Sequence, residues 1–250
     1  MVLIHGIGSE LCVWEPVLEP LGERYSVIAL DLPGFGHSPA LAAEVAPTPE
    51  ALARAVGELL DELVIEHAHV AGNSLGGWIA LELGKQGRAA SVCALCPAGL
   101  WGAPVVAPGT AVRGRAHRLA RRLRPAIPVL MMSPQVRRLA LAPFVANPDK
   151  VPYHAAWRML SSYGRATAYD ATSAAMRQNF FRDPELITVP VTLAFGERDR
   201  LIRPTREAIT EAHHVVLSGC GHIPMWDDPE LVTAVIDETA RRATAPATAT

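Results

Sequence analysis

The stretch His69-Val70-Ala71-Gly72-Asn73-Ser74-Leu75-Gly76-Gly77-Trp78 decides the fold. Apolar residues precede its first glycine, and from Trp78 onward apolar residues recur at helical spacing, so the stretch predicts a strand, a sharp turn and a helix. Gly72 and Gly76 allow the two backbones to approach closely and tolerate a strained bend. Such a turn lifts the hydroxyl of Ser74 out of the sheet and makes it a candidate nucleophile. Taken alone, the same pattern also fits a glycine-rich connection with an incidental serine.

The composition is that of a globular protein. The chain has 250 residues, half of them hydrophobic, which is enough for one large domain or a domain with an insertion. No apolar run is long enough to span a bilayer, and the N-terminus lacks a basic segment with a cleavage site, so we expect a cytoplasmic protein without stable membrane insertion. The four cysteines are too scattered for a disulfide framework, and we expect buried structural thiols rather than a redox Cys93-x-x-Cys96 pair.

Strands and helices are predicted to alternate along most of the chain. The predicted strands outside the opening stretch are Val2–Ile4, Ser26–Asp31, Ala90–Cys96, Val189–Phe195 and His214–Leu217. The predicted helices outside it are Trp14–Leu21, a segment that starts at Thr48-Pro49-Glu50, a segment around Arg206–Glu211, and Pro229–Arg242. This alternation predicts an α/β fold with a mostly parallel sheet and helices on both faces.

The alternation stops over residues 102–186. This segment is rich in Pro, Arg, Ala and Met, its pattern is mainly helical with breaks at prolines, and it is predicted to be an insertion. Residues 1–101 and 187–242 would then form the core. The Ala/Thr-rich residues 243–250 are predicted to be a disordered tail.

The insertion also carries an unusual charge pattern. Between Gly102 and Pro148 there are eight arginines and no acidic residue. Three interpretations stay open: a solvated face of helices, a surface that attracts an anionic substrate or a membrane, and a nucleic-acid site. We expect no nucleic-acid partner, because no aromatic residues are interleaved with the arginines.

Chemically active side chains follow several of the predicted strands. In open parallel sheets ligands bind outside the carboxyl ends of the strands, where this chain places Ser74, Asp199 and His222. A serine hydroxyl needs a base to take its proton, and a histidine base needs a carboxylate that orients it. The three residues can fill these roles. The backbone N–H groups of Ile7 and Leu75 are the expected donors to the oxyanion of a tetrahedral intermediate.

Five motifs together resemble the alpha/beta-hydrolase superfamily. They are the Gly72-x-Ser74-x-Gly76 elbow, the His5-Gly6 loop, the Asp31-x-Pro33-Gly34-x-Gly36-x-Ser38 loop, the Gly196-x-x-Asp199 turn and Gly221-His222. They run in that family's order from Val2 to about Glu230. The resemblance implies an alpha/beta-hydrolase fold, a helical cap at residues 102–186, a Ser74, Asp199 and His222 triad, and chemistry without a cofactor or a metal.

The chain departs from that family at its start. Members usually begin with an antiparallel hairpin before the His-Gly strand, whereas this chain begins almost at that strand. Either the N-terminus is incomplete, or the edge strand near Ser26 is unprotected and invites a partner, which makes a homodimer one expected assembly.

Several other residues receive a predicted role. The substrate pocket is predicted to include Gly6, Asn73, Trp101 and Ile223, although packing is the more common role of aromatic residues such as Trp101. His5 is interpreted as a structural ligand of its own loop. Further secondary assignments are Glu197 as a rival acid, Asp31 and His37 as braces of a loop, and His213 and His214 as strand residues that bind no metal.

The predicted activity is hydrolysis of a carboxylic ester of a small or medium apolar acid. One rival is hydrolysis of a carbon–carbon bond, since Gly72–Gly77 resembles the elbow of meta-cleavage product hydrolases, although those enzymes usually carry Trp where this chain has Ile223. Epoxide hydrolases and haloalkane dehalogenases are disfavoured, because their elbow nucleophile is Asp. Thioesterase, lactonase and perhydrolase activities are not separated from esterase by sequence, and a non-catalytic small-molecule binding protein remains an alternative from another class.

Overall fold

The strands of the computed structural model form one parallel sheet. The structure describes residues 1–103, 110–203, 209 and 211–244, with the side chains of 110–113 also left outside the description. The strands are β1 (Val2–Ile4), β2 (Ile28–Leu30), β3 (Ala68–Asn73), β4 (Ala89–Leu95), β5 (Val191–Gly196) and β6 (His213–Leu217). Their order is β2-β1-β3-β4-β5-β6, and every neighbouring pair is parallel. The predicted α/β fold with a parallel sheet is confirmed.

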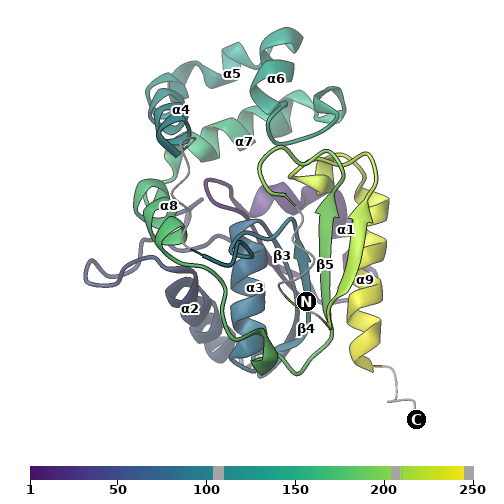
Figure 1. Cartoon of the computed structure of the whole chain (residues 1–250). Coiled ribbons are helices and arrows are strands. Elements are labelled where there is room, and N and C mark those ends of the chain that lie inside the picture. Colours follow the sequence, from purple (N-terminus) through teal and green to yellow (C-terminus); the bar gives the residue numbers. More distant parts are fainter. Residues whose placement is uncertain (104–109, 204–208, 210, 245–250) are drawn as a thin grey trace.

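Helices cover both faces of this sheet (Figure 1). Helices α2 (Pro49–Glu62) and α3 (Leu75–Lys85) lie on one face, and α1 (Glu15–Gly22) and α9 (Pro229–Thr244) lie on the other. Because successive strand residues point to opposite faces, Ile4 and Val70 join the core under α2 and α3, while Leu3 and Ala71 join the core under α1 and α9. The sheet therefore separates two apolar layers, which explains why its strands read as continuous apolar runs.

The predicted start of α2 is confirmed in detail. The Thr48 hydroxyl accepts a hydrogen bond from the Ala51 N–H at 3.2 Å, and Pro49 is the first helical residue. The capping oxygen satisfies an amide that the helix itself leaves without an acceptor, and proline at this position loses no hydrogen bond.

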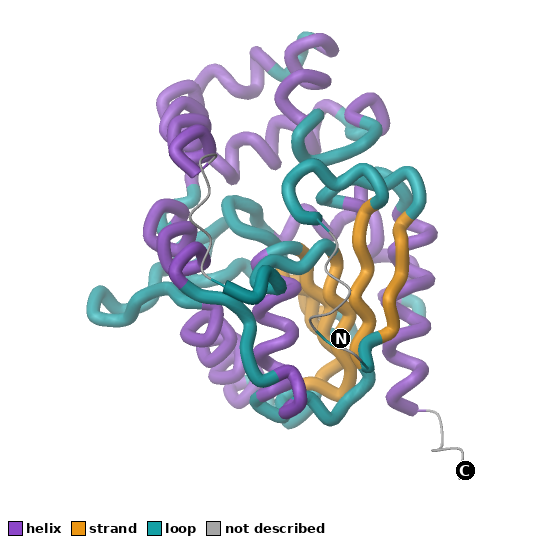
Figure 2. Tube along the Cα trace, viewed as in Figure 1, coloured by secondary structure: helices purple, strands orange, loops and turns teal. Residues whose placement is uncertain are grey.

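Between β4 and β5 the chain forms a helical insertion, here residues 110–178. Its helices are α4 (Thr110–Leu123), α5 (Ile127–Leu130), α6 (Pro134–Leu141), α7 (Tyr153–Arg165) and α8 (Tyr169–Gln178). Figure 2 shows most of them beyond the carboxyl ends of the strands. Helix α7 is joined to the core by ion pairs from Arg158 to Glu15 and from Arg165 to Glu10. The insertion is thereby fixed over the edge of the sheet where ligands of parallel folds bind.

Some predicted segments shift or fall outside the description. Most of the helix expected around Arg206–Glu211 lies outside the described residues, as do residues 245–250 of the expected tail. Helix α9 extends to Thr244, so Ala243 and Thr244 are helical rather than part of a disordered tail. Alanine favours helix continuation, which accounts for the extension. Strand β2 lies at an edge of the sheet, as expected. No helix in the described part of the chain has the length and apolar character needed to cross a bilayer.

Candidate active site

Ser74 occupies a strained turn between β3 and α3. Its backbone has a φ of 58° and a ψ of −114°, a conformation that side-chain-bearing residues rarely adopt. A Cβ added to Gly72 would lie 2.0 Å from the Gly76 carbonyl oxygen, and a Cβ added to Gly76 would lie 2.1 Å from the Ile4 carbonyl oxygen. Both positions therefore require glycine. The predicted strand, sharp turn and helix are confirmed, and strain of this kind clusters at functional sites.

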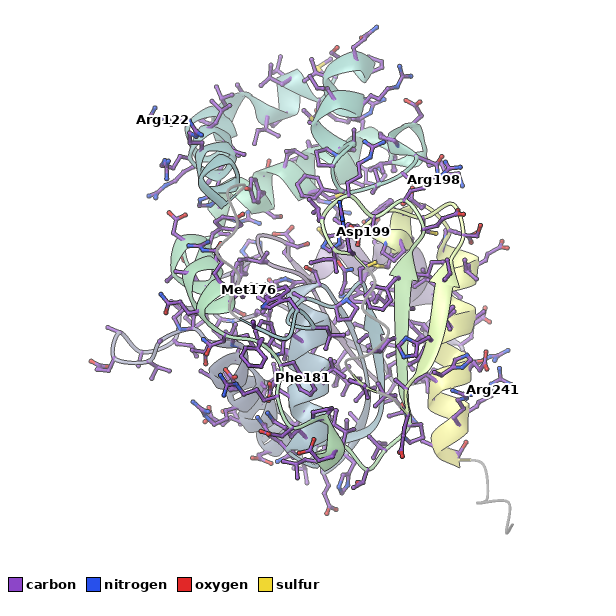
Figure 3. All side chains as sticks on the ribbon, viewed as in Figure 1. Arg122, Met176, Phe181, Arg198, Asp199 and Arg241 are labelled. Carbon is purple, nitrogen blue, oxygen red and sulfur yellow. The ribbon has the colours of Figure 1, made fainter. Side chains whose placement is uncertain are left out.

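Asp199 and His222 form a hydrogen-bonded pair beside the ends of β5 and β6. The His222 Nδ1 lies 2.8 Å from Asp199 Oδ2. The other carboxylate oxygen, Oδ1, accepts the N–H groups of Leu201 at 2.7 Å and Ile202 at 3.0 Å. Figure 3 labels Asp199 beside the carboxyl end of β5. Because an ionised carboxylate only accepts hydrogen bonds, this contact assigns the proton to Nδ1 and leaves Nε2 as the basic nitrogen.

The charge of Asp199 is stabilised despite its partial burial. Burial disfavours the carboxylate, but the hydrogen bond and charge of His222 and the two amide donors outweigh it and hold the Asp199 pKa below its ordinary value. Asp199 is therefore an anion at neutral pH, which is the state that orients a histidine base.

Asn73 joins this pair to the serine turn. Its side-chain Nδ2 donates to the carbonyl oxygen of His222 at 2.8 Å and to that of Leu95 at 3.2 Å. The backbone that carries His222 is thus held against the residue that precedes Ser74. Among the described residues the Ser74 hydroxyl makes no hydrogen bond, and its side chain is 6% exposed.

The loop after β1 runs beside the serine. A Cβ added to Gly6 would lie 3.1 Å from the Ser74 Cβ, so the loop that carries Ile7 passes next to the turn. Leu75 is the first residue of α3, and the first amides of a helix have no acceptor within it. Leu75 directly follows Ser74 and Ile7 directly follows Gly6, and the joint use of their amides at an oxyanion is a proposal.

His5 has the structural role that the sequence predicted. Its ring is fully buried, Nε2 accepts the Leu32 N–H at 3.0 Å, and Nδ1 lies 2.7 Å from the Gly6 carbonyl oxygen. Burial lowers the His5 pKa and keeps the ring neutral. His5 thus connects two loops of the candidate site and has no free ring nitrogen for chemistry.

Hydrogen bonds show the roles of two more acidic residues, Glu197 and Asp31. Glu197 is exposed and accepts the Gly219 N–H at 2.8 Å, whereas Asp199 is the acid that contacts the histidine. Asp31 braces its loop as expected, because its carboxylate accepts the N–H groups of His37 at 2.9 Å and Leu11 at 2.7 Å.

A sequence profile described as the alpha/beta hydrolase family matches residues 1–235. The chain is an alpha/beta hydrolase. A relative named epoxide hydrolase EphH, from Mycobacterium tuberculosis, is 33% identical over 215 residues, which cover 75% of this chain and 94% of that protein. Among solved structures, the enol-lactonase from Burkholderia xenovorans LB400 has a TM-score of 0.75 and 25% identity, covering 96% of this alpha/beta hydrolase and 90% of that chain. A thermophilic esterase from Thermogutta terrifontis shares the fold, with a TM-score of 0.74, 21% identity, and coverage of 98% and 90%.

The residues predicted to line the substrate pocket of this alpha/beta hydrolase differ in their distance from Ser74 and in their contacts. Trp101 is half-buried, packs edge-on against Trp78 with ring centroids 5.6 Å apart, and donates its indole N–H to the Asn179 carbonyl oxygen at 3.0 Å. Gly6 and Asn73 lie beside Ser74, as described, and Ile223 is buried directly after His222. Packing alone accounts for Trp101, and the pocket role of all four residues stays a prediction.

Cys96 is a site residue whose position the sequence did not indicate. Its fully buried sulfur accepts the Gly196 N–H at 3.3 Å and donates to the Gly221 carbonyl oxygen at 3.7 Å. Burial, and then the charge of Asp199, raise the Cys96 pKa well above its ordinary value, so it is a thiol. Ligating atoms of Cys96, Asp199 and His222 lie within 4.8 Å of one another, the one group in the described chain with metal-holding spacing.

Asp227 is the second residue that sequence reasoning missed. Its carboxylate is 1% exposed and accepts the N–H groups of Gly221 at 2.8 Å, Ala146 at 3.0 Å and Asn147 at 2.7 Å. These bonds join the backbone next to His222 to the helical insertion. The only available signal was an aspartate in an apolar stretch five residues after the histidine.

Proposed function

We propose that this alpha/beta hydrolase is a serine hydrolase that cleaves carboxylic esters of small to medium apolar acids through an acyl-enzyme. The observation that carries the proposal is the Asp199–His222 hydrogen bond held next to the strained Ser74 turn by Asn73. A nucleophile, an oriented base and a buried carboxylate in this order are what acyl transfer requires.

Each group has a defined step. Ser74 Oγ attacks the ester carbonyl carbon while His222 Nε2 takes the hydroxyl proton, and Asp199 stabilises the imidazolium that forms. The amides of Leu75 and Ile7 donate to the oxyanion, an interaction worth about 3–4 kcal/mol per donor in a dry site. His222 then protonates the leaving alcohol, and the ester oxygen departs. Water then enters, loses a proton to His222 and attacks the acyl carbonyl carbon. The bond from that carbon to Ser74 Oγ breaks, His222 returns the proton to Ser74 Oγ, and the acid leaves. The helical insertion acts as a cap that excludes bulk water.

The chemistry of the nucleophile separates ester from epoxide hydrolysis. The relative from Mycobacterium tuberculosis is named an epoxide hydrolase. If Ser74 opened an epoxide, the product would be an ether on the serine oxygen, which has no carbonyl carbon for water to attack, and turnover would stop. An acylated Ser74 retains that carbonyl. Ester cleavage is also supported by the named activity of the enol-lactonase, because a lactone is a cyclic ester.

The deciding experiment measures hydrolysis of p-nitrophenyl esters from acetate to decanoate. We expect turnover of short or medium chains, a loss of about 10⁴-fold or more in kcat for Ser74→Ala, and no change for the exposed control Ser218→Ala. Styrene oxide, assayed beside the esters, should not be hydrolysed. Turnover of the epoxide by the wild type would reject the proposal.

Two rival functions have their own readouts. If folded wild-type protein hydrolyses no ester but cleaves a vinylogous diketone, the carbon–carbon hydrolase takes the place of the esterase. Labelling with a fluorophosphonate tests the non-catalytic alternative, since an activated serine reacts and a binding protein with an inert Ser74 does not. We expect labelling of the wild type and none of Ser74→Ala.

A further inference from the structure

The outer face of the helical insertion exposes apolar side chains that no described element covers. We define this outer face as the exposed side chains of residues 115–139. Its large apolar members are Leu119, Leu123, Val129, Leu130, Met132, Val136 and Leu139. Val129 is 70% exposed, Met132 67% and Leu139 79%, values far from those of ordinary packing residues. Exposed apolar side chains gathered on one surface mark an interaction site.

Arginines are interleaved with these apolar residues. In α4, Leu119 lies three residues from Arg122 and four from Arg115, so the three share the side of the helix opposite the buried His117. Figure 3 places Arg122 at the outer end of α4, away from the sheet. In the described chain no carboxylate pairs with Arg118 or Arg122, and the segment from Gly102 to Pro148 contains no acidic residue at all.

The position of the outer face in the fold leaves it accessible. Helices α4, α5 and α6 pack by their inner sides on α7, which lies between them and the rest of the molecule (Figure 1). The buried anchors of this packing include Ile127, Met131 and Leu141. The exposed residues of α5 and α6 therefore lie on the side of the insertion away from the sheet, as does Arg122 at the end of α4, whereas Arg115 and Arg118 line a hollow beside α8.

We propose that the outer face docks on the surface of an anionic lipid bilayer. Exposed apolar side chains enter the boundary between headgroups and acyl chains, while the arginines contact lipid phosphates. The long arginine side chains suit this boundary, because their methylene groups remain among apolar neighbours while the guanidinium reaches the headgroups. Docking of this kind needs no helix that spans the membrane, and it is independent of the ester chemistry at Ser74.

Charge argues against the outer face as a contact between two copies of this chain. A symmetric pair would bring two arginine clusters together without an acidic residue from residues 102–148 to offset them. An acidic protein would also satisfy the arginines. A bilayer uses both kinds of side chain at once, and binding to vesicles that contain no protein supplies the test.

The experiment is co-sedimentation of the full chain with vesicles. One set contains equal parts of phosphatidylcholine and phosphatidylglycerol, and the other contains phosphatidylcholine alone. We expect binding to the anionic vesicles at least about tenfold tighter than to the neutral ones, weakened by added salt. The variant Arg122→Glu and the variant Val129→Asp/Met132→Asp should each weaken binding by about tenfold or more.

Matched controls separate docking from general changes in charge and hydropathy. The control variants are Arg54→Glu and Leu186→Asp, which change the same residue types elsewhere. Arg54 is exposed on α2, and Leu186 precedes β5 and is 56% exposed. Both variants should bind like the wild type. Far-ultraviolet circular dichroism verifies that each variant is folded.

Three outcomes would overturn the proposal. The first is absence of binding to anionic vesicles. The second is binding that the arginine variant weakens and the apolar variant does not, which is the behaviour of a surface for an acidic protein or a nucleic acid. The third is a dimer in solution that both outer-face variants dissociate, which would assign the face to self-association.

Discussion

Replacing Asp227 by alanine should destabilise the protein through three backbone amides at once. The carboxylate accepts the N–H groups of Gly221, Ala146 and Asn147 at 2.7–3.0 Å in a fully buried position. A buried donor left without its acceptor destabilises a protein by about 1–3 kcal/mol, so three donors with partial relaxation amount to about 4 kcal/mol. For a chain of this size each kcal/mol lowers Tm by about 2–4 °C, which predicts a loss of about 8–16 °C.

The neighbouring carboxylate is the matched control. Among the described residues the Asp228 carboxylate accepts only the Leu231 N–H, at 2.9 Å, at the start of α9. Its replacement by alanine should therefore cost about 1 kcal/mol. Thermal unfolding followed by circular dichroism compares the two variants. Because Gly221 precedes His222, Asp227→Ala should also lower kcat on the ester substrate relative to Asp228→Ala. A Tm loss for Asp227→Ala no greater than that for Asp228→Ala would refute the assigned role of its hydrogen bonds.

Three further outcomes are expected. Gly76→Ala should lower the free energy of unfolding by about 3 kcal/mol or yield insoluble protein, because its Cβ would meet the Ile4 carbonyl oxygen. The control Gly57→Ala, whose Cβ meets open space on α2, should raise it by about 0.5–1 kcal/mol in urea unfolding. Equal effects of the two substitutions would contradict the close approach at Gly76. The depressed Asp199 pKa contributes stability that is present above about pH 3.9 and is lost as pH falls through the folded pKa. The difference in free energy of unfolding between the wild type and Asp199→Asn should therefore shrink on acidification. A difference that does not change with pH would argue against a charged Asp199. Burial raises the pKa of Cys12, Cys93 and Cys220 to about 12, so a disulfide reagent should react slowly with the native protein. After unfolding it should react rapidly with all four thiols. A thiol that reacts rapidly in the native protein would contradict this burial.

The sequence predicted the elements whose cause is local. The glycines at 72 and 76, the Thr48 cap and the apolar strands each act through neighbouring residues, and the structure has the corresponding turn, helix start and sheet. The choice of Asp199 over Glu197 followed from motif spacing and agrees with the observed hydrogen bond to His222.

What the sequence did not predict depends on contacts between distant segments. Cys96 was expected to be a buried structural thiol, which it is, but its sulfur contacts Gly196 at the end of β5 and Gly221, which lie 100 and 125 residues further along the chain. An aspartate in an apolar stretch was a signal at Asp227, but it indicated no partner, because Ala146 and Asn147 contribute backbone amides, which every residue except proline offers. Spacing along a chain cannot show which loop will approach which.

The attachment of the helical insertion to the His222 loop constrains protein engineering. The Ile223 N–H donates to the Phe144 carbonyl oxygen at 2.8 Å, and a Cβ on Gly221 would lie 2.7 Å from the Ala146 nitrogen. An insertion grafted from another hydrolase to change substrate preference must therefore reproduce the backbone path at 144–147. If that path shifts, the grafted helical insertion displaces His222, and a chimera designed for a new specificity loses its catalytic base.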